Sequence, residues 1–433
     1  MAGDASSRPA LNLLVLSNNY PPHAMGGYEL LCAEHVGWLR QRGHDVTVVT
    51  STFGLTPTDP PEVIGASGER VVRCLDFHWR EYQHRRPNMV NVWAGERTQR
   101  EALQEVLGET RAEAALAWGM GGISKSMLQV VDDAAIPVIA VVGEHWPIWD
   151  VDSDTWLRTW RLLRRLPGSS SLRGWANRTF APTDVRRVMG HLVPLYVSDE
   201  LRRAVETSHP AWAARGAVVP NGIRQDLFGR ERPADASLHQ PLRLLCAGRL
   251  ERRKGAHTLV EALPAMVAAG LDPAISFVGW RDASYQRELA ARADQLGVAD
   301  RIDWRDSVPR ERMADVYLEH DILVFPTIWS EPFGLVPLEA MAAGCVVVAT
   351  ATGGSVEFLR DGENALVFPA QDAAALAGRV IELAGDAALL RRLRQGGRQT
   401  SAQYSFERYA ARLEEEVERV AAGRPPPDKL ISC

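Results

Sequence analysis

Residues 11–50 read LNLLVLSNNYPPHAMGGYELLCAEHVGWLRQRGHDVTVVT, and this stretch decides the fold. Leu11–Ser17 is a continuous apolar run, as expected of a parallel strand that is buried on both faces. Two prolines interrupt the chain, a helical pattern follows from Gly27 to Arg42, and a second apolar run covers Val46–Thr50. Strand, helix and strand in this order predict a βαβ unit, and therefore a parallel sheet.

The same alternation continues along the chain. Short apolar runs typical of strands, with helical patterns between them, occur at Ala114–Ala117, Pro137–Val142, Leu192–Val197, Ala217–Val219, Leu242–Ala247, Ala274–Val278, Ile302–Trp304, Ile322–Phe325 and Val346–Ala349. A polar stretch around Gln225–Leu242 separates two halves of similar size. We therefore predict an α/β protein with two Rossmann-like, doubly wound domains, residues 1–236 and 237–404, followed by a helix and tail at 405–433.

Length and composition support a two-domain protein. The chain has 433 residues, of which 46% are hydrophobic and 24% charged, the composition of an ordinary globular protein. Its net charge of −5 argues against a general nucleic-acid binder, which is usually basic. Five scattered cysteines without a CxxC pair predict neither a disulfide framework nor a zinc site. We recognise no signal peptide or spanning segment, so we predict a cytoplasmic location.

The loop after the first strand places Gly26 and Gly27 at a helix N-terminus. Free backbone N–H groups and the positive end of the helix dipole make such a turn suitable for an anion. A flexible loop that merely needs glycine is the alternative interpretation. Because the loop is not GxGxxG, a nicotinamide dinucleotide site is disfavoured.

A second candidate loop, GRLERRKG at residues 248–255, directly follows the first strand of the second half. Arg249 and Lys254 lie at a strand end, where two cations can converge on a pair of phosphates. The alternative is a solvated charged turn, which is what most charge runs are.

The strongest candidate segment is SEPFGLVPLEAMAAG, residues 330–344. Glu331 follows a strand, and Pro332 keeps it out of the next helix. Gly334 and its neighbours open that helix and present N–H groups, and Glu339 lies on its first turns. Carboxylates suit the vicinal hydroxyls of sugars and ribose, because each oxygen accepts hydrogen bonds.

From Glu331 to Glu339 the sequence resembles the E-x7-E motif of the retaining family-4 glycosyltransferases, which have the GT-B fold. GRLERRKG resembles the diphosphate loop of that family, and VPNGIRQDLF at residues 219–228 resembles its segment before the linker. The resemblance extends from about residue 11 to residue 420. It is specific for the family and does not specify the substrate.

The resemblance implies a nucleotide-diphosphate sugar of UDP or GDP type as donor, a hydroxyl acceptor, and no metal or other cofactor. Arg249 and Lys254 would hold the donor diphosphate and stabilise it as a leaving group. Glu331 would contact the transferred sugar, and Glu339 would bind the ribose. The family is thought to react on the front face of the sugar, with a donor phosphate oxygen accepting the acceptor proton.

The remaining donor contacts implied by the resemblance come from backbone groups. The N–H groups of Gly334, Leu335 and Val336 would face phosphate or sugar oxygens. Gly26 and Gly27 would face the same diphosphate from the acceptor-side, amino-terminal domain. The carboxy-terminal helix would cross back to pack on that domain.

One departure from the family pattern concerns a histidine near the reacting sugar. Many members carry His-Asp after the strand that corresponds to Pro137–Val142, whereas this sequence has Gly143-Glu-His-Trp-Pro. Aligned on Trp-Pro, the family histidine falls on Gly143 and the aspartate on Glu144; aligned on the imidazole, it is His145. His145 is a candidate for orienting sugar or acceptor, and a structural histidine is the alternative.

The predicted function is retaining, metal-independent sugar transfer to a glycan, a lipid or a small metabolite. The alternatives left open are a GT-B-fold isomerase or phosphorylase, and a non-catalytic sensor of sugar nucleotides. The arginine-rich interval Arg158–Arg187 allows peripheral contact with an anionic membrane, although a solvated basic surface is the simpler interpretation.

Overall fold

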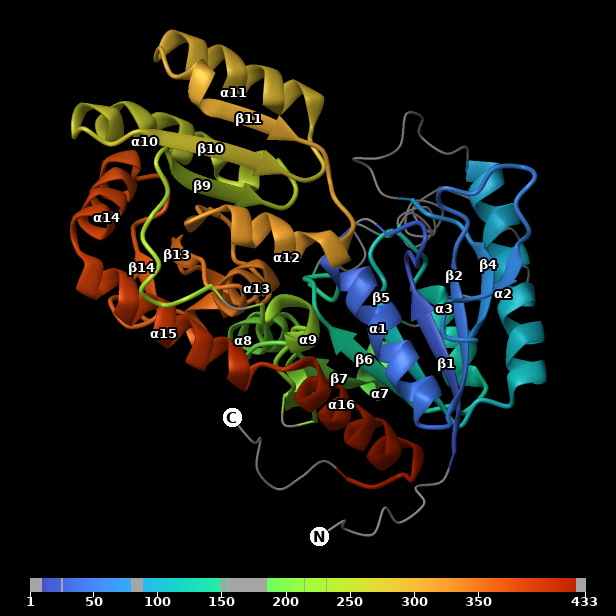
Figure 1. The fold of residues 1–433 in the computed structure, drawn as a ribbon. Helices are drawn as coiled ribbons and strands as arrows, with labels where there is room; N and C mark the ends of the chain where they lie inside the picture. The colour runs from blue at the N-terminus through green and yellow to red at the C-terminus, as the bar shows by residue number, and fades with distance from the viewer. Residues whose placement is uncertain are drawn as a thin grey trace, which may run out of the picture. The chain divides into compact units, whose positions relative to one another are not determined.

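The computed structural model describes residues 10–24, 26–78, 89–148, 154, 185–213, 215–230 and 232–425. The chain forms two compact units. Unit 1 comprises Met1–Val197, Leu201–Val219 and Ala410–Cys433, and unit 2 comprises Ser198–Glu200 and Pro220–Tyr409 (Figure 1). The predicted boundary at residue 236 therefore falls inside unit 2.

The described part of unit 1 is built on an eight-stranded sheet of order β3-β4-β2-β1-β5-β6-β7-β8. All neighbours are parallel except β3 and β4, which are antiparallel. The strands are β1 Asn12–Ser17, β2 Asp45–Ser51, β3 Glu62–Ile64, β4 Arg70–Leu75, β5 Ala114–Gly119, β6 Val138–Val142, β7 Val193–Tyr196 and β8 Ala217–Val218.

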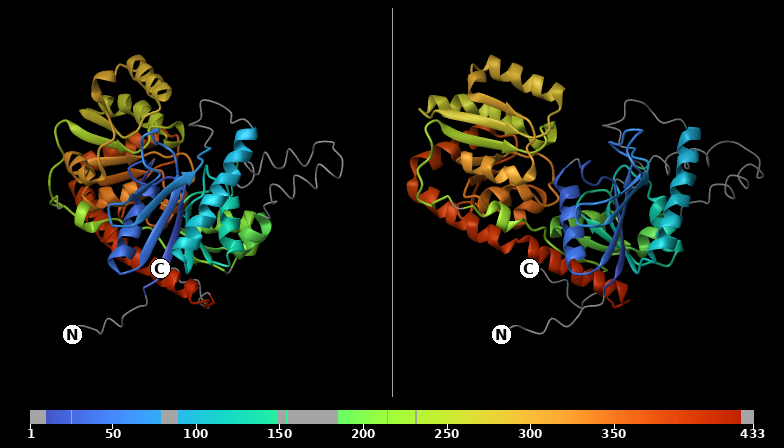
Figure 2. Two further views of the ribbon diagram at one scale, coloured as in Figure 1. Left: turned by 90° about the vertical axis from the view of Figure 1, so that its right-hand side faces the viewer. Right: turned by 45° about the vertical axis from the view of Figure 1, so that its right-hand side comes forward.

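The helices of unit 1 lie on both faces of this sheet, and α1 and α2 cover opposite faces (Figures 1 and 2). They are α1 Gly27–Gln41, α2 Met89–Thr110, α3 Ser126–Asp133, α7 Val185–His191 and α8 Asp199–Ser208, with a 3-10 turn at Pro210–Trp212. The central strands, such as β5 and β6, are buried at every residue, which explains their continuous apolar sequences.

The described part of unit 2 has a six-stranded, all-parallel sheet of order β11-β10-β9-β12-β13-β14. Its strands are β9 Leu242–Ala247, β10 Pro273–Val278, β11 Ile302–Arg305, β12 Ile322–Phe325, β13 Val346–Ala349 and β14 Ala365–Val367. Its α-helices are α9 Gln225–Phe228, α10 Ala256–Ala268, α11 Ala283–Gln295, α12 Arg310–Glu319, α13 Leu335–Ala342, α14 Ala373–Gly385 and α15 Ala387–Gln403, and 3-10 turns lie at Arg252–Lys254, Ala299–Arg301 and Gly353–Glu357.

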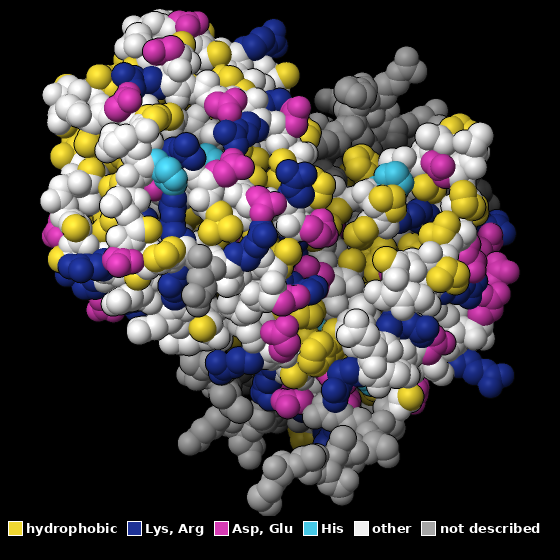
Figure 3. Space-filling view, in the orientation of Figure 1, with side chains coloured by type: hydrophobic (Ala, Val, Ile, Leu, Met, Phe, Trp, Pro, Cys, Tyr) yellow, Lys and Arg dark blue, Asp and Glu magenta, His cyan; other side chains and the backbone are white. Residues whose placement is uncertain are grey.

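The core of unit 2 lies between the sheet and helices α10, α11, α14 and α15. Leu259, Leu263 and Leu376, for example, are fully buried in it. On the face of unit 2 drawn in Figure 3, basic and acidic side chains are interspersed. This mixture is consistent with the many surface ion pairs, such as Arg305 with Asp303.

The last helix, α16 Phe406–Ala421, begins in unit 2 and continues into unit 1. None of the helices in the described ranges is both long and apolar enough to span a bilayer. The arginine-rich interval proposed for membrane contact lies almost entirely outside the described residues. Its last residue, Arg187, forms ion pairs with Asp132 and Asp133.

Three strands were not predicted from the sequence: β3, β4 and β14. β3 and β14 have only three residues each, and β3 is an exposed edge strand. β4 carries two arginines in six residues, which interrupts its apolar pattern. The other predicted strands are confirmed, with bounds that differ by at most two residues.

Candidate functional site

The loop that follows β9 is positioned by glycines in the left-handed region. Gly248 has a φ of +121°, and its N–H donates to the Val278 carbonyl oxygen at 2.9 Å. Gly255, with a φ of +71°, begins α10, and a Cβ there would lie 1.9 Å from the Pro326 carbonyl oxygen. The loop can therefore approach the loop after β12 only because residue 255 has no side chain.

This close approach brings together two residues that the sequence analysis assigned to different roles. The Lys254 ammonium forms an ion pair with Glu331 Oε1, and Thr327 Oγ1 donates to the same oxygen at 3.0 Å. Glu331 is only 7% exposed, and the Trp329 ring centroid lies 5.8 Å from Lys254 Nζ. A carboxylate and an ammonium thus stand side by side at the carboxyl edge of the sheet.

An open pocket of about 380 Å³ lies beside this pair. Arg249, Lys254 and Arg281 line it, at the ends of β9 and β10. Arg249 Nη1 lies 3.2 Å from Glu251 Oε1, and Arg281 is ion-paired with Asp306. Three cations facing one pocket suit a ligand with more than one negative charge. Arg281 was not predicted from the sequence, although its place three residues after a predicted strand could have indicated it.

The helix that follows Glu331 begins where the sequence predicts. Gly334 is the N-cap of α13, with a φ of +102°, and Leu335 and Val336 are the first helical residues. Phe333 is buried, with its ring centroid 5.4 Å from that of Phe358. This packing fixes the helix start, whose first N–H groups are suited to an anion or a sugar oxygen.

Glu339 lies inside α13 and is 8% exposed. The Tyr317 hydroxyl donates to its Oε2 at 2.9 Å, and Arg310 Nη2 donates to its Oε1 at 3.3 Å. Burial, together with the Glu339 carboxylate, holds the pKa of Tyr317 well above its usual value, so this hydroxyl stays a donor. Both partners come from α12, and they orient the carboxylate. Sequence reasoning missed them because they meet α13 only in the folded unit.

In unit 1, Gly26 is the N-cap of α1 and Gly27 is its exposed first residue, as predicted. The next residue, Tyr28, was not singled out. Its hydroxyl lies 2.5 Å from the Val141 carbonyl oxygen and accepts from the Gly143 N–H at 3.2 Å. Tyr28 therefore ties the start of α1 to the end of β6.

Tyr28 also occupies the space beside Gly143, one of the two positions that align with the family histidine. A Cβ on Gly143 would lie 2.1 Å from Cε2 of the Tyr28 ring, so a side chain at this position would require Tyr28 to move. The neighbouring Glu144 and His145 are half-buried, and the His145 carbonyl oxygen accepts from the Ile148 N–H at 2.9 Å. The role of His145 stays a prediction.

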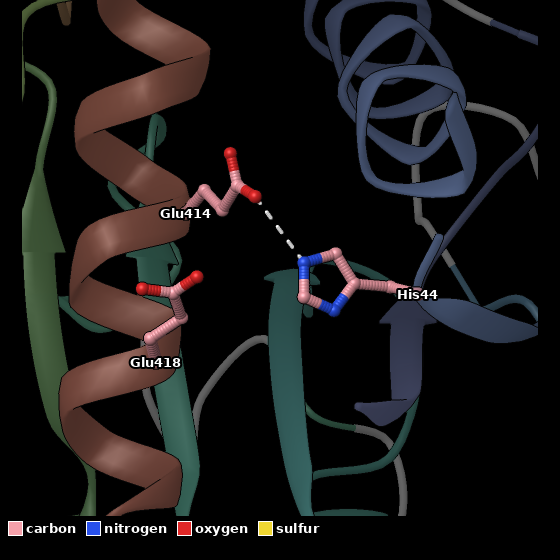
Figure 4. Close-up of side chains that lie close together, drawn as sticks. All are labelled: His44, Glu414 and Glu418. Carbon is pink, nitrogen blue, oxygen red and sulfur yellow. Dashed lines mark hydrogen bonds and ion pairs between the residues drawn. The ribbon is translucent and has the colours of Figure 1, made fainter. Parts of the chain in front are cut away.

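His44, Glu414 and Glu418 form a cluster with suitable residue types for a metal ion (Figure 4). His44 Nδ1 accepts from the Leu11 N–H at 3.2 Å, so its Nε2 carries the proton and faces Glu414 Oε1 at 3.3 Å. Arg42 and Trp38 also donate to Glu414, at 2.7 and 2.9 Å. Because Glu414 is already neutralised by these donors, we interpret the cluster as an anchor for α16.

Comparison with known proteins identifies the fold. Residues 229–400 match the family model described as "Glycosyl transferases group 1". Sucrose-phosphate synthase from Thermosynechococcus elongatus has a similar structure, with a TM-score of 0.70 and 19% identity, covering 95% of this chain and 99% of the other. Anabaena Alr3699/HepE in complex with UDP-glucose gives a TM-score of 0.66 at 18% identity, covering 93% and 98%. The chain therefore has the GT-B fold of glycosyltransferases.

A curated relative agrees with this assignment. The D-inositol 3-phosphate glycosyltransferase of Xylanimonas cellulosilytica is 32% identical over 271 residues, which are 58% of this chain and 64% of the relative. The chain thus spans a little under two thirds of that protein. These matches confirm the resemblance to the glycosyltransferases, and they place residues 229–400 in glycosyl transferases group 1.

Proposed function

We propose that this protein transfers a sugar from a nucleotide-diphosphate sugar to a hydroxyl acceptor, with retention of anomeric configuration. The observation that carries the proposal is the pairing of Lys254 with Glu331 beside an open pocket that Arg249 also lines. This arrangement offers cations to a diphosphate and a carboxylate to the sugar attached to it. UDP-glucose in the complex of the similarly folded HepE protein supports a donor of this kind.

The leaving group determines most of the chemistry. As the bond from the anomeric carbon to the phosphate oxygen breaks, negative charge grows on the diphosphate. Arg249, Lys254 and the N–H groups of Gly334, Leu335 and Val336 stabilise that charge. The acceptor oxygen forms its bond to the anomeric carbon on the same face, and its proton passes to a phosphate oxygen. No metal is required for these steps.

The two carboxylates have different tasks in this proposal. Glu331 accepts hydrogen bonds from the transferred sugar, and the Lys254 ammonium opens toward the diphosphate when the donor binds. Glu339, held by Tyr317 and Arg310, accepts the ribose hydroxyls. Gly26, Gly27 and His145 of unit 1 face donor or acceptor in the same reaction. The family description and the relative's name favour transfer over an isomerase, a phosphorylase or a non-catalytic sensor.

Thermal unfolding with a nucleotide panel tests the proposal. A ligand that binds only the folded state raises the unfolding midpoint, so UDP or GDP and the matching nucleotide sugars should stabilise unit 2. Released nucleotide should then accumulate when a suitable acceptor is added. A protein that no nucleoside diphosphate stabilises, and that releases nucleotide from no donor, would refute the proposal.

A further inference from the structure

Arg281 lines the open pocket of unit 2, and the proposed reaction gives it no role. It lies in the loop after β10, and the pocket of about 380 Å³ is also lined by Arg249 and Lys254. Asp306 holds its Nη2 in an ion pair, and its Nη1 is buried without a hydrogen-bond partner in the described ranges. A buried N–H group without a partner costs free energy, so Nη1 is a donor available to a ligand in the pocket.

The backbone on either side of Arg281 is held in place. Gly279 has a φ of +139°, and a Cβ there would lie 2.1 Å from the Gly248 carbonyl oxygen, so the loops after β9 and β10 approach each other closely. The Leu250 N–H donates to the Trp280 carbonyl oxygen at 2.8 Å and joins the same two loops. The loop that carries Arg281 is therefore tied to the loop that carries the other two cations of the pocket.

The order of the strands separates Arg281 from the proposed sugar site. Lys254 and Glu331 form their ion pair between the ends of β9 and β12, whereas Arg281 follows β10, on the other side of β9. Neighbouring strands lie about 4.8 Å apart, so β10 is about 10 Å from β12. A donor whose sugar contacts Glu331 and whose diphosphate contacts Lys254 therefore reaches Arg281 with its nucleoside.

The proposed ribose site lies on the same path. Arg310, the first residue of α12, donates to Glu339 at 3.3 Å. Asp306, the partner of Arg281, lies four residues earlier, in the short loop between β11 and α12. Glu339 and Arg281 are thus connected to the two ends of one short loop. Because the base is attached to the ribose, a ribose at Glu339 directs its base toward this loop.

The pocket beside Arg281 also has an apolar wall. Leu250, Phe277 and Val278 line it. Phe277 is only 2% exposed, and its ring stacks on that of Trp304 with the centroids 4.8 Å apart, which keeps this wall rigid. A rigid apolar wall next to a guanidinium suits a flat ring that carries hydrogen-bond acceptors on its edge.

We propose that Arg281 binds the base of the donor and makes the protein select guanine over uracil. This inference rests on the proposed function and names the donor of the same site. Guanine carries two adjacent acceptors, O6 and N7, which match two N–H groups of a guanidinium. Uracil has no second acceptor beside O4 on this edge, and adenine has an amino group in place of O6, so neither base accepts both hydrogen bonds.

Calorimetric titration of the full chain with four nucleoside diphosphates tests the proposal. The four are GDP, UDP, ADP and 7-deaza-GDP, which lacks only the N7 acceptor of guanine. We expect GDP to bind at least tenfold more tightly than UDP and ADP, a difference of about 1.4 kcal/mol, and at least threefold more tightly than 7-deaza-GDP. The proposal is overturned if UDP, ADP or 7-deaza-GDP binds as tightly as GDP.

Variants of Arg281 connect the preference to this side chain. Arg281→Met should lower the affinity for GDP at least tenfold and leave the affinity for UDP within twofold, because only guanine engages the guanidinium. Arg281→Lys keeps the charge but not the planar fork, so it should lose the preference for GDP as well. Arg287→Met removes an exposed arginine of α11 and is the matched control, which should leave both affinities unchanged.

The same titrations distinguish the base from the diphosphate as the partner of Arg281. The unfolding midpoint of each variant, measured on the same samples, checks that it is folded. If folded Arg281→Met binds GDP and UDP more weakly by the same factor, Arg281 acts on the diphosphate and the base assignment is wrong. If Arg281→Met binds both like the wild type, Arg281 contacts neither group and the assignment is equally wrong.

Nucleotide preference separates this inference from the proposed function. Protein that binds UDP at least as tightly as GDP, and releases nucleotide from a UDP-sugar, would overturn the guanine assignment and support sugar transfer. Protein that binds none of the four nucleotides would refute the proposed function and this inference with it.

Discussion

At the scale of single residues, the proposed reaction depends on Lys254. Its ammonium lies against Glu331 and the pocket, so it is the cation best placed to follow charge onto the leaving group. Lys254→Met should lower kcat for nucleotide release about a hundredfold, because losing one such donor costs about 2.7–4 kcal/mol. Arg252→Met is the matched control, since Arg252 is 65% exposed and pairs with Glu288. Steady-state kinetics measure both; a Lys254→Met variant at near wild-type rate would contradict the assignment.

The two carboxylates allow a finer test at the same scale. Glu331→Gln should mainly lower kcat, because its sugar contact strengthens as charge develops at the anomeric carbon. Glu339→Gln should mainly raise the KM for the donor, because ribose is bound equally in the ground and transition states. Full kinetic curves for both variants distinguish the two effects. If Glu331→Gln mainly raises the KM and Glu339→Gln mainly lowers kcat, the roles proposed for the two carboxylates are wrong and must be exchanged.

At the scale of elements, the turn into α10 carries a stability prediction. Gly255 and Gly270 both have positive φ values, +71° and +85°. A Cβ on Gly255 would lie 1.9 Å from the Pro326 carbonyl oxygen, whereas a Cβ on Gly270 would have no described atom within 4 Å. Alanine at either position costs about 1–2 kcal/mol of left-handed strain. Gly255→Ala should lose clearly more than Gly270→Ala, because the loop after β12 must also move. Urea unfolding measures both losses, and equal losses would show that the contact is unimportant.

The anchor of α16 gives a pH prediction. Burial by itself raises the pKa of Glu414. Hydrogen bonds from Trp38, Arg42 and His44 lower it by more, so the pKa of Glu414 is below its usual value. The ionised form is therefore stabilised by folding, and this contribution is complete above the unfolded value of about 4.3 and is lost as the pH falls through the lower folded value. Glu414→Gln should cost about 1–3 kcal/mol at neutral pH and flatten the acid limb of the stability curve. An unchanged acid limb would contradict this interpretation of the anchor.

The elements also show what a sequence can and cannot predict. Buried parallel strands such as β5 can be recognised from the sequence, because the residues on both faces are apolar. Strand β4 cannot, since its arginines interrupt the apolar pattern that its buried residues would otherwise form. Likewise the motif at residues 330–344 identified Glu331 and Glu339, but their partners Lys254 and Tyr317 are distant in sequence. Pairings of that kind depend on tertiary packing.

At the scale of the whole molecule, the fold and the match of residues 229–400 define a glycosyltransferase architecture, while donor, acceptor and stereochemistry are our proposals. The feature of unit 2 that bears on the donor is the pocket lined by Arg249, Lys254 and Arg281, which we propose to hold the diphosphate.

The most direct test of the central claim is a proton nuclear magnetic resonance time course of the reaction in EDTA. Protein is mixed with UDP-glucose or GDP-mannose and a panel of hydroxyl acceptors, and the anomeric signals are followed. We predict that the donor signal decays, free nucleotide appears, and a new anomeric signal with the configuration of the donor grows at a rate that added magnesium does not change. Consumption of neither donor, a product of inverted configuration, or activity that requires magnesium would contradict the proposed reaction.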